Sequence, residues 1–180
     1  MPGIPPKPLG NLHVRRLDAA DAAAYRALRL RALQEHPQAF TSSFEEESPK
    51  PLSVAEQRLS AGAAGKFWGA FDGDTLVGMV GLDRESRQKN RHKATVVAMY
   101  VAEEYAGRGA GAALMNALLL EAKASAIELL VLTVTRGNAA ARHLYDKLGF
   151  TCFGVEPGAI RVHQQAFDKE HMFLLLRPHH

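Results

Sequence analysis

Residues 106–113 read Ala-Gly-Arg-Gly-Ala-Gly-Ala-Ala and place glycine at alternate positions directly before an apolar helical pattern. Glycine costs backbone entropy and adds no packing, so such a repeat needs a reason. The first turn of a helix has unpaired N–H groups and lies at the positive end of the helix dipole. Without side chains over these amides, a phosphate can reach them. Gly107, Gly109 and Gly111 therefore predict an anion site at a helix N-terminus, where Arg108 adds a positive charge.

Two common phosphate-binding loops do not fit this stretch. A Walker A loop ends in Gly-Lys-Ser/Thr, whereas this one ends in Gly-Ala-Ala. Residues 107–112 do satisfy the dinucleotide-binding pattern G-x-G-x-x-A. That pattern belongs to the first strand and helix of its domain, with an acidic residue closing the next strand. Here several strands are predicted upstream and the next strand closes with Thr135, so we reject both interpretations.

A second candidate constellation lies in residues 132–150, which read LTVTRGNAAARHLYDKLGF. Asn138 is suited to cap a helix that begins at Ala139. Tyr145 follows seven residues later, two turns along the same helix face. Taken alone, the residue types favour a core aromatic for Tyr145 over a catalytic phenol.

The elements around these residues predict a mixed α+β fold whose central, mostly antiparallel sheet has about seven strands flanked by helices. A hairpin that turns at Asp72-Gly73-Asp74 is predicted over residues 66–85, and residues 39–51 are predicted to form a loop. Further strands are predicted at 11–17, 94–101 and 127–135, with two short strands near the C-terminus. Helices are predicted between Asp18 and Pro37, near 53–62, after the glycine turn and from Asn138.

Composition indicates one domain, because 180 residues of which 47% are hydrophobic can bury a single sizeable core. We expect this domain at 11–177, after a proline-rich flexible arm at 1–10 and before a tail at 178–180. No apolar stretch is long enough to predict a membrane span. The net charge of +3 is too small to indicate a nucleic-acid partner. The single cysteine, Cys152, excludes an internal disulfide and indicates a cytoplasmic protein.

The two constellations together resemble the GNAT acetyltransferase superfamily. Its loop for acetyl-coenzyme A (acetyl-CoA) reads Arg/Gln-x-x-Gly-x-Gly/Ala after a strand, and this chain matches it at Gly109 and Gly111. Ala106 stands where the family usually has Arg or Gln. The second block is similar to the family's at Asn138, Ala141, Leu144, Tyr145, Lys147, Gly149 and Phe150. The resemblance extends over roughly residues 11–176.

This resemblance implies the GNAT fold and an N-acetyltransferase that uses acetyl-CoA and no metal. The acceptor would be a primary amine of a small molecule or peptide, attacking directly in a ternary complex, and a homodimer would be a common outcome. Tyr145 would act as the general acid that protonates the departing sulfur. Cofactor contacts are implied for Met99, Tyr100, Val101, Gly107, Arg108, Gly109, Ala110, Gly111, Ala112, Asn138 and Tyr145.

The general base is less well defined by the sequence. An alkylammonium group with a pKa of about 10.4 is only about one part in a thousand neutral at pH 7, so an acidic group should help. The strand at 94–101 carries no carboxylate, which leaves a non-catalytic CoA-binding sensor as the alternative function. Glu45 and Glu46 are candidates as base or as amine-attracting groups, against the alternative of a solvated acidic loop. His92 is a further candidate, whereas Cys152 is expected to be a small buried hydrophobe rather than a nucleophile.

Overall fold

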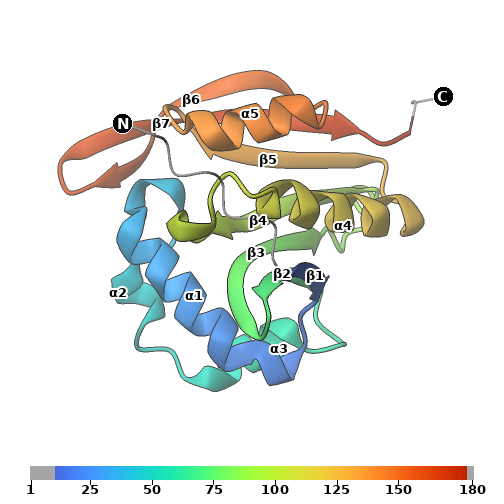
Figure 1. Ribbon diagram of the computed structural model, residues 1–180. Coiled ribbons are helices and arrows are strands. Elements are labelled where there is room, and N and C mark those ends of the chain that lie inside the picture. Colours follow the sequence, from blue (N-terminus) through green and yellow to red (C-terminus); the bar gives the residue numbers. More distant parts are fainter. Residues whose placement is uncertain (1–10, 178–180) are drawn as a thin grey trace, which may run out of the picture.

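The computed structural model describes residues 11–177, so the predicted arm at 1–10 and tail at 178–180 lie outside the described residues. Its strands form one seven-stranded sheet (Figure 1). These strands are β1 (Leu12–Arg16), β2 (Gly65–Asp72), β3 (Thr75–Arg84), β4 (Lys93–Val101), β5 (Leu129–Thr135), β6 (Thr151–Val162) and β7 (Gln165–Leu175).

The strand order in this sheet is β1-β2-β3-β4-β5-β7-β6. Only β4 and β5 pair in parallel, and the other neighbouring strands pair antiparallel. This confirms the predicted mostly antiparallel mixed sheet. The helices are α1 (Ala22–Glu35), α2 (Phe44–Glu47), α3 (Leu52–Leu59), α4 (Ala110–Ala124) and α5 (Ala139–Lys147), with short 3-10 turns η1 (Ala19–Asp21), η2 (Pro37–Ala39) and η3 (Glu103–Tyr105).

Two sequence predictions were wrong in detail. The predicted loop at 39–51 contains the short helix α2, because Ser43 and Glu46 form a capping box at its N-terminus. The last two strands are not short: β6 has 12 residues and β7 has 11. Irregularities in the pairing of β6 with β7 interrupt their alternation, so a period-2 pattern does not reveal their length.

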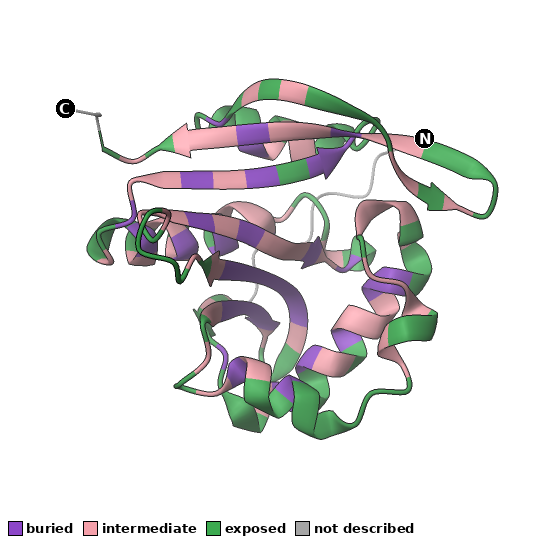
Figure 2. Cartoon of the chain, turned by 180° about the vertical axis from the view of Figure 1, so that it is seen from behind, coloured by how far each residue is buried: buried purple, intermediate pink, exposed green. Residues whose placement is uncertain are grey.

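The sheet separates two hydrophobic cores. Helix α4 packs on one face of β1–β4, whereas α1 and α3 pack against β3 and β2 in the other core. In Figure 1, α5 lies beside the β5–β7 half of the sheet. Leu114, Met115 and Leu118 of α4 are buried in the first core, called the α4 core below, in agreement with the apolar helical pattern after the glycine turn. Tyr25 and Leu28 of α1 belong to the second core, called the α1 core below, with Phe67 of β2. Figure 2 shows the burial concentrated on the central strands, while the far end of the β6–β7 hairpin is mostly exposed.

The pairing of β4 with β5 is short. Three residue pairs join them, from Lys93↔Leu129 to Thr95↔Val131. Beyond Thr95, β4 continues through Val101 with no further pairing to β5. Parallel neighbours normally continue a regular ladder, so the sheet is open between the C-terminal halves of these two strands. No helix among residues 11–177 is long and apolar enough to cross a membrane.

Close packing of β2 against β3 yields a stability prediction. Gly81 pairs with Phe67, and a Cβ on Gly81 would lie 2.3 Å from a Phe67 ring carbon. Phe67 is only 1% exposed, so its ring has little room to move. We expect Gly81→Ala to lower the free energy of unfolding by about 1–3 kcal/mol, measured by urea denaturation. Gly62→Ala is the control, since no atom lies within 4 Å of its Cβ position; equal effects of both substitutions would contradict the packing account.

Candidate active site

The glycine turn forms the N-terminus of α4, as predicted. Gly109 is the N-cap residue with φ of 81°, and without a side chain it forms no side-chain cap. Gly107 also has a positive φ, 73°. Ala113 N–H donates to the Gly109 carbonyl at 3.0 Å, whereas the amides of residues 107–112 have no hydrogen-bond partner among the described residues. A run of free amides at the positive end of a helix dipole can bind an anion.

The three glycines serve different purposes. Gly107 and Gly109 adopt left-handed backbone conformations that other residues enter only with strain, and no atom lies within 4 Å of their Cβ positions. Gly111 has an ordinary helical conformation but is closely approached. A Cβ there would lie 3.3 Å from a Leu144 methyl group and 4.0 Å from a Val101 methyl group. The first turn of α4 therefore meets both the end of β4 and α5.

Arg108 adds the expected positive charge beside this turn. Its guanidinium lies 5.0 Å from the centre of the Tyr105 ring, within range of a cation–π interaction. The Tyr105 hydroxyl donates to Asp72 at 3.0 Å, and this bond raises the Tyr105 pKa. Tyr105 is thereby held under Arg108, while the guanidinium has no carboxylate partner among the described residues.

A β-bulge determines which side chains of β4 face each core. Ala98 has φ of 55°, and the register with β3 shifts opposite this segment. Before the bulge, Val96 faces the α4 core; after it, Met99 and Val101 pack against that core. Tyr100 is consequently turned into the α1 core. The bulge thus directs Tyr100 toward the C-terminal end of α1.

An acidic network at that end of α1 was missed by the sequence analysis. The Tyr100 hydroxyl donates to Glu35 at 2.6 Å. Arg31 donates to Glu35 at 2.7 Å and to both oxygens of Glu104 at 2.8 and 2.7 Å. The hydrogen bond from Arg31 lowers the pKa of Glu35, with a smaller contribution from Tyr100, and it lowers the pKa of Glu104 to about 2. Both carboxylates are therefore ionised near neutral pH.

The turn after α1 crosses to the other half of the sheet. The Thr135 hydroxyl, at the end of β5, donates to the Gln38 carbonyl in η2 at 2.7 Å. Lys169 of β7 is only 8% exposed, and its ammonium donates to the Thr41 hydroxyl at 2.8 Å. Burial lowers the pKa of Lys169. These two bonds join the segment after α1 to β5 and β7, which lie across the opening from β4.

Helix α5 carries the second predicted constellation. Asn138 is its N-cap residue, as expected, and its side chain accepts a hydrogen bond from the Ala141 amide at 3.2 Å. Tyr145 is 5% exposed and packs against Phe150, with ring centres 5.8 Å apart. Burial raises the pKa of Tyr145. The phenol is therefore neutral and able to donate a proton, and its hydroxyl has no hydrogen-bond partner within the described range.

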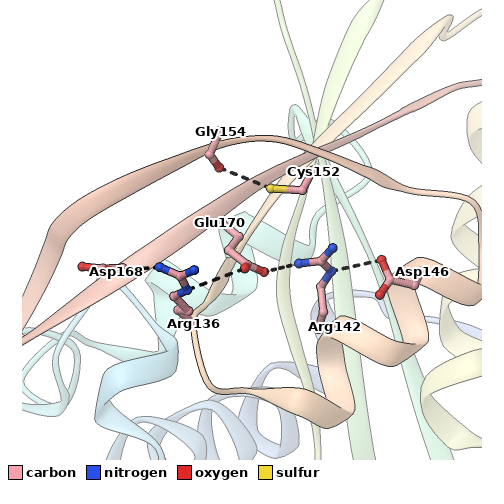
Figure 3. Close-up of polar contacts among 7 residues, drawn as sticks. All are labelled: Arg136, Arg142, Asp146, Cys152, Gly154, Asp168 and Glu170. Atoms are coloured by element: carbon pink, nitrogen blue, oxygen red, sulfur yellow. Dashed lines mark hydrogen bonds and ion pairs between the residues drawn. The ribbon is translucent and has the colours of Figure 1, made fainter.

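Ion pairs fix α5 to β7 (Figure 3). Arg142 lies between Asp146, at 3.0 Å, and Glu170, at 2.5 Å. Arg136, in the turn before α5, lies 4.0 Å from Glu170 and 3.7 Å from Asp168. Because Asp168 and Glu170 belong to β7, the two arginines hold both the turn and the helix that carry Asn138 and Tyr145.

The remaining candidates lie elsewhere. Glu46 accepts from the Ser43 amide at 3.0 Å as part of the α2 capping box, and Glu45 is exposed beside it. His92 precedes β4, at the opposite end of that strand from Tyr100. Cys152 is half-buried against the α4 core, and its thiol lies 3.5 Å from the Gly154 carbonyl (Figure 3). The described residues contain no cluster of three or more side chains suited to bind a metal ion.

Comparison with known proteins gives matches over most of the chain. Residues 30–150 match the family model described as "Acetyltransferase (GNAT) family". A curated L-methionine sulfoximine/L-methionine sulfone acetyltransferase from Pseudomonas aeruginosa is 32% identical over 80 residues. That match covers 44% of this chain and 46% of the relative, so it spans about half the length of the curated protein.

Solved structures show the same fold over nearly the whole chain. A GNAT-family acetyltransferase from Streptococcus pneumoniae aligns with a TM-score of 0.80 and 24% identity, covering 92% of this chain and 99% of that one. A putative acetyltransferase from Salmonella typhimurium, solved with its cofactor acetyl-CoA, aligns with a TM-score of 0.78 and 24% identity, covering 95% and 97%. Because the family model matches more than half of this chain, the chain belongs to the GNAT acetyltransferase family.

Proposed function

We propose that this protein is an N-acetyltransferase that transfers the acetyl group of acetyl-CoA directly to a primary amine in a ternary complex. The observation that carries the proposal is the run of free amides at residues 107–112, beside the open end of the β4–β5 pairing. A diphosphate carries several oxygens that accept hydrogen bonds and suits such amides. Family membership supports the same cosubstrate.

The proposed acetyl-CoA site consists of residues for which the sequence resemblance implied cofactor contacts. The amides of Gly107, Gly109, Ala110, Gly111 and Ala112 would hold the diphosphate, with Arg108 as an additional charge. Beyond Thr95, β4 has no strand paired to its β5 side, so backbone groups of residues 99–101 are available to an extended ligand. Asn138, at the start of α5, would contact the same ligand from the other side of the opening.

Acetyl transfer places one demand on each substrate. The amine must lose a proton, and the departing thiolate must gain one. A thiol pKa of about 8.5 and a phenol pKa of about 10 make transfer from a phenol to the sulfur nearly balanced. We infer that Tyr145 supplies this proton from its hydroxyl. Its burial supports the role, because it keeps the phenol protonated at neutral pH.

The acceptor is proposed to be a primary amine of a small molecule or a peptide. The curated relative's name refers to L-methionine sulfoximine and L-methionine sulfone, both of which are amino acids with a primary amine. Acidic groups on the α1 side would attract a cationic amine, and the sequence proposed Glu45 and Glu46 for this role. Glu35 lies closer to β4, bonded to Tyr100. With its pKa lowered by Arg31, Glu35 is better suited to attract an ammonium than to remove its proton.

Location and assembly are inferred from the cysteine content and from an exposed apolar patch. We infer a cytoplasmic protein, on the basis of the single cysteine, with no nucleic-acid or membrane partner. A homodimer is supported by an apolar patch on one face of the β5–β7–β6 half-sheet. Phe153 is 60% exposed there and Leu175 43% exposed. Patches of large exposed apolar side chains commonly mark sites of protein association.

Adding a negative charge to the α4 N-terminus tests the proposed diphosphate site. Ala112 is the third residue of α4, so Glu at this position interacts favourably with the helix dipole, by about 0.3–1 kcal/mol. It would also repel a bound diphosphate. We therefore expect Ala112→Glu to weaken acetyl-CoA binding at least about tenfold, or about 1.4 kcal/mol, in titration calorimetry, with no loss of thermal stability.

Asn116→Glu is the matched control. Asn116 is exposed and lies one turn further along the same helix, so it receives the same charge farther from the free amides. We expect acetyl-CoA affinity close to that of the unmodified protein. A folded Ala112→Glu variant that binds acetyl-CoA as tightly as the control would show that the diphosphate binds elsewhere.

Removing one hydroxyl tests the catalytic proposal. Tyr145→Phe keeps the ring that packs on Phe150, so folding and acetyl-CoA affinity should change little. Loss of a general acid costs about 10²–10⁴ in rate, or about 3–5 kcal/mol in barrier height. We expect turnover to fall at least about tenfold with a slow amine substrate, measured by thiol release. Because the Tyr145 pKa is raised, deprotonation of this residue should not reduce activity below about pH 10.

The identity of the leaving thiol provides the control for this variant. A thioester whose thiol has a lower pKa needs less help to depart, so the deficit of Tyr145→Phe should shrink with it. Normal turnover by Tyr145→Phe would assign the residue to the core alone. Tight acetyl-CoA binding by the unmodified protein, without transfer to any amine or peptide tested, would instead support the alternative of a CoA-binding sensor.

A further inference from the structure

A cavity lies between α1, α2 and α3, and none of its lining residues belongs to β4 or β5. Its volume is about 40 Å³. Since one water molecule needs about 10–15 Å³ of such space, the cavity has room for a carboxylate group of three heavy atoms. The cavity is partly open to solvent, so a short alkyl chain can extend from it along the lining residues. Its apolar wall comes from Leu30, Pro51, Val54 and Ala55. This is the size and partial polarity of a small organic acid rather than of a bulky ligand.

Two polar groups that line this cavity are buried without partners. The Tyr25 hydroxyl and the Arg29 Nε have no hydrogen-bond partner among the described residues. Tyr25 itself is only 2% exposed. The two residues are four apart in α1, so their side chains lie on the same face of the helix, one turn apart. Buried donors left unpaired are costly, and a ligand in the cavity that accepts from both would satisfy them.

The charges around the cavity favour an anion. Four lining side chains are cationic, Arg26, Arg29, Lys50 and Arg58, and one lining side chain, Glu47, is acidic. Glu47 is paired with Lys50 at 2.9 Å. This leaves the three arginines with no ion-pair partner in the described part of the chain.

The arginines are held in place by other contacts. Arg26 donates to the Ser48 and Lys50 carbonyls at 2.8 and 3.1 Å. Arg58 lies 4.8 Å from the centre of the Phe67 ring. Arg29 reaches the Ser42 hydroxyl at 3.4 Å through Nη2, which leaves its Nε unpaired. Burial raises the pKa of the Tyr25 hydroxyl; among the nearby charges, Arg58 and Arg29 lower this pKa more than Glu47 and Asp83 raise it. The positive charges are therefore fixed around the unpaired donors.

We propose that this cavity binds a small aliphatic carboxylate. Its oxygens would accept hydrogen bonds from Tyr25 Oη and Arg29 Nε, and its short alkyl chain would lie against Val54 and Pro51. Inorganic phosphate fits less well, because the apolar wall would leave several of its oxygens unpaired. The site is independent of the proposed acetyl transfer. A bound carboxylate would connect α1 to the α2–α3 segment, so it should stabilise the folded protein.

The test uses the full chain without acetyl-CoA and butyrate as the probe. We expect saturable binding in titration calorimetry and a rise in melting temperature, with sodium chloride of equal ionic strength as the reference. Arg29→Gln should weaken butyrate binding at least tenfold, and Tyr25→Phe severalfold. Without butyrate, Tyr25→Phe should melt at the same or a higher temperature, because it removes an unpaired buried hydroxyl. Arg15→Gln, which alters an exposed ion pair with Asp21, is the control and should bind butyrate normally.

Several outcomes would overturn the proposal. These are no saturable binding of butyrate, an equal stabilisation by phosphate or chloride, and unchanged affinity in Arg29→Gln or Tyr25→Phe. A lower melting temperature of Tyr25→Phe without butyrate would also contradict it, since the hydroxyl would then have a partner. Should Arg29→Gln fail to fold, Arg29→Lys keeps the charge and removes the Nε donor, and normal butyrate affinity in that variant would overturn the proposed contact.

Discussion

The hydrogen bonds between β4 and β5 stop at Thr95 and Val131, and the proposed site depends on this interruption. A continued ladder would pair the end of β4 with β5 and leave no free strand edge for a ligand. Strands β5 and β7 are instead connected to the segment that follows α1 by side chains, through Thr135 to Gln38 and Lys169 to Thr41. The opening is therefore bounded by fixed groups on both sides.

The bulge at Ala98 gives the two faces of this opening different chemistry. It turns Met99 and Val101 toward α4, where the amides are free, and it turns Tyr100 toward the carboxylate of Glu35. An anionic cosubstrate and a cationic acceptor would thus approach the opening from opposite faces of the sheet. Direct transfer in a ternary complex is the mechanism that this separation supports.

Local sequence patterns predicted much of this arrangement, because the relevant features depend on neighbouring residues. The glycine turn, the apolar pattern of the helix that follows it and the capping role of Asn138 follow from spacing and residue type. The network of Arg31, Glu35 and Glu104 could not be predicted in this way, because it joins residues far apart in the sequence. The bulge at Ala98 could not be predicted either, because alanine is not a residue type that indicates a positive φ.

The central claim is that the amides of residues 107–112 bind the diphosphate of acetyl-CoA. Its most direct test is a titration of the ¹⁵N-labelled protein with coenzyme A, followed by amide chemical shifts. The account predicts that the largest changes fall on residues 107–112 and on the unpaired end of β4, with small changes in α2 and α3. Saturable binding that leaves the amides of residues 107–112 unshifted would contradict it.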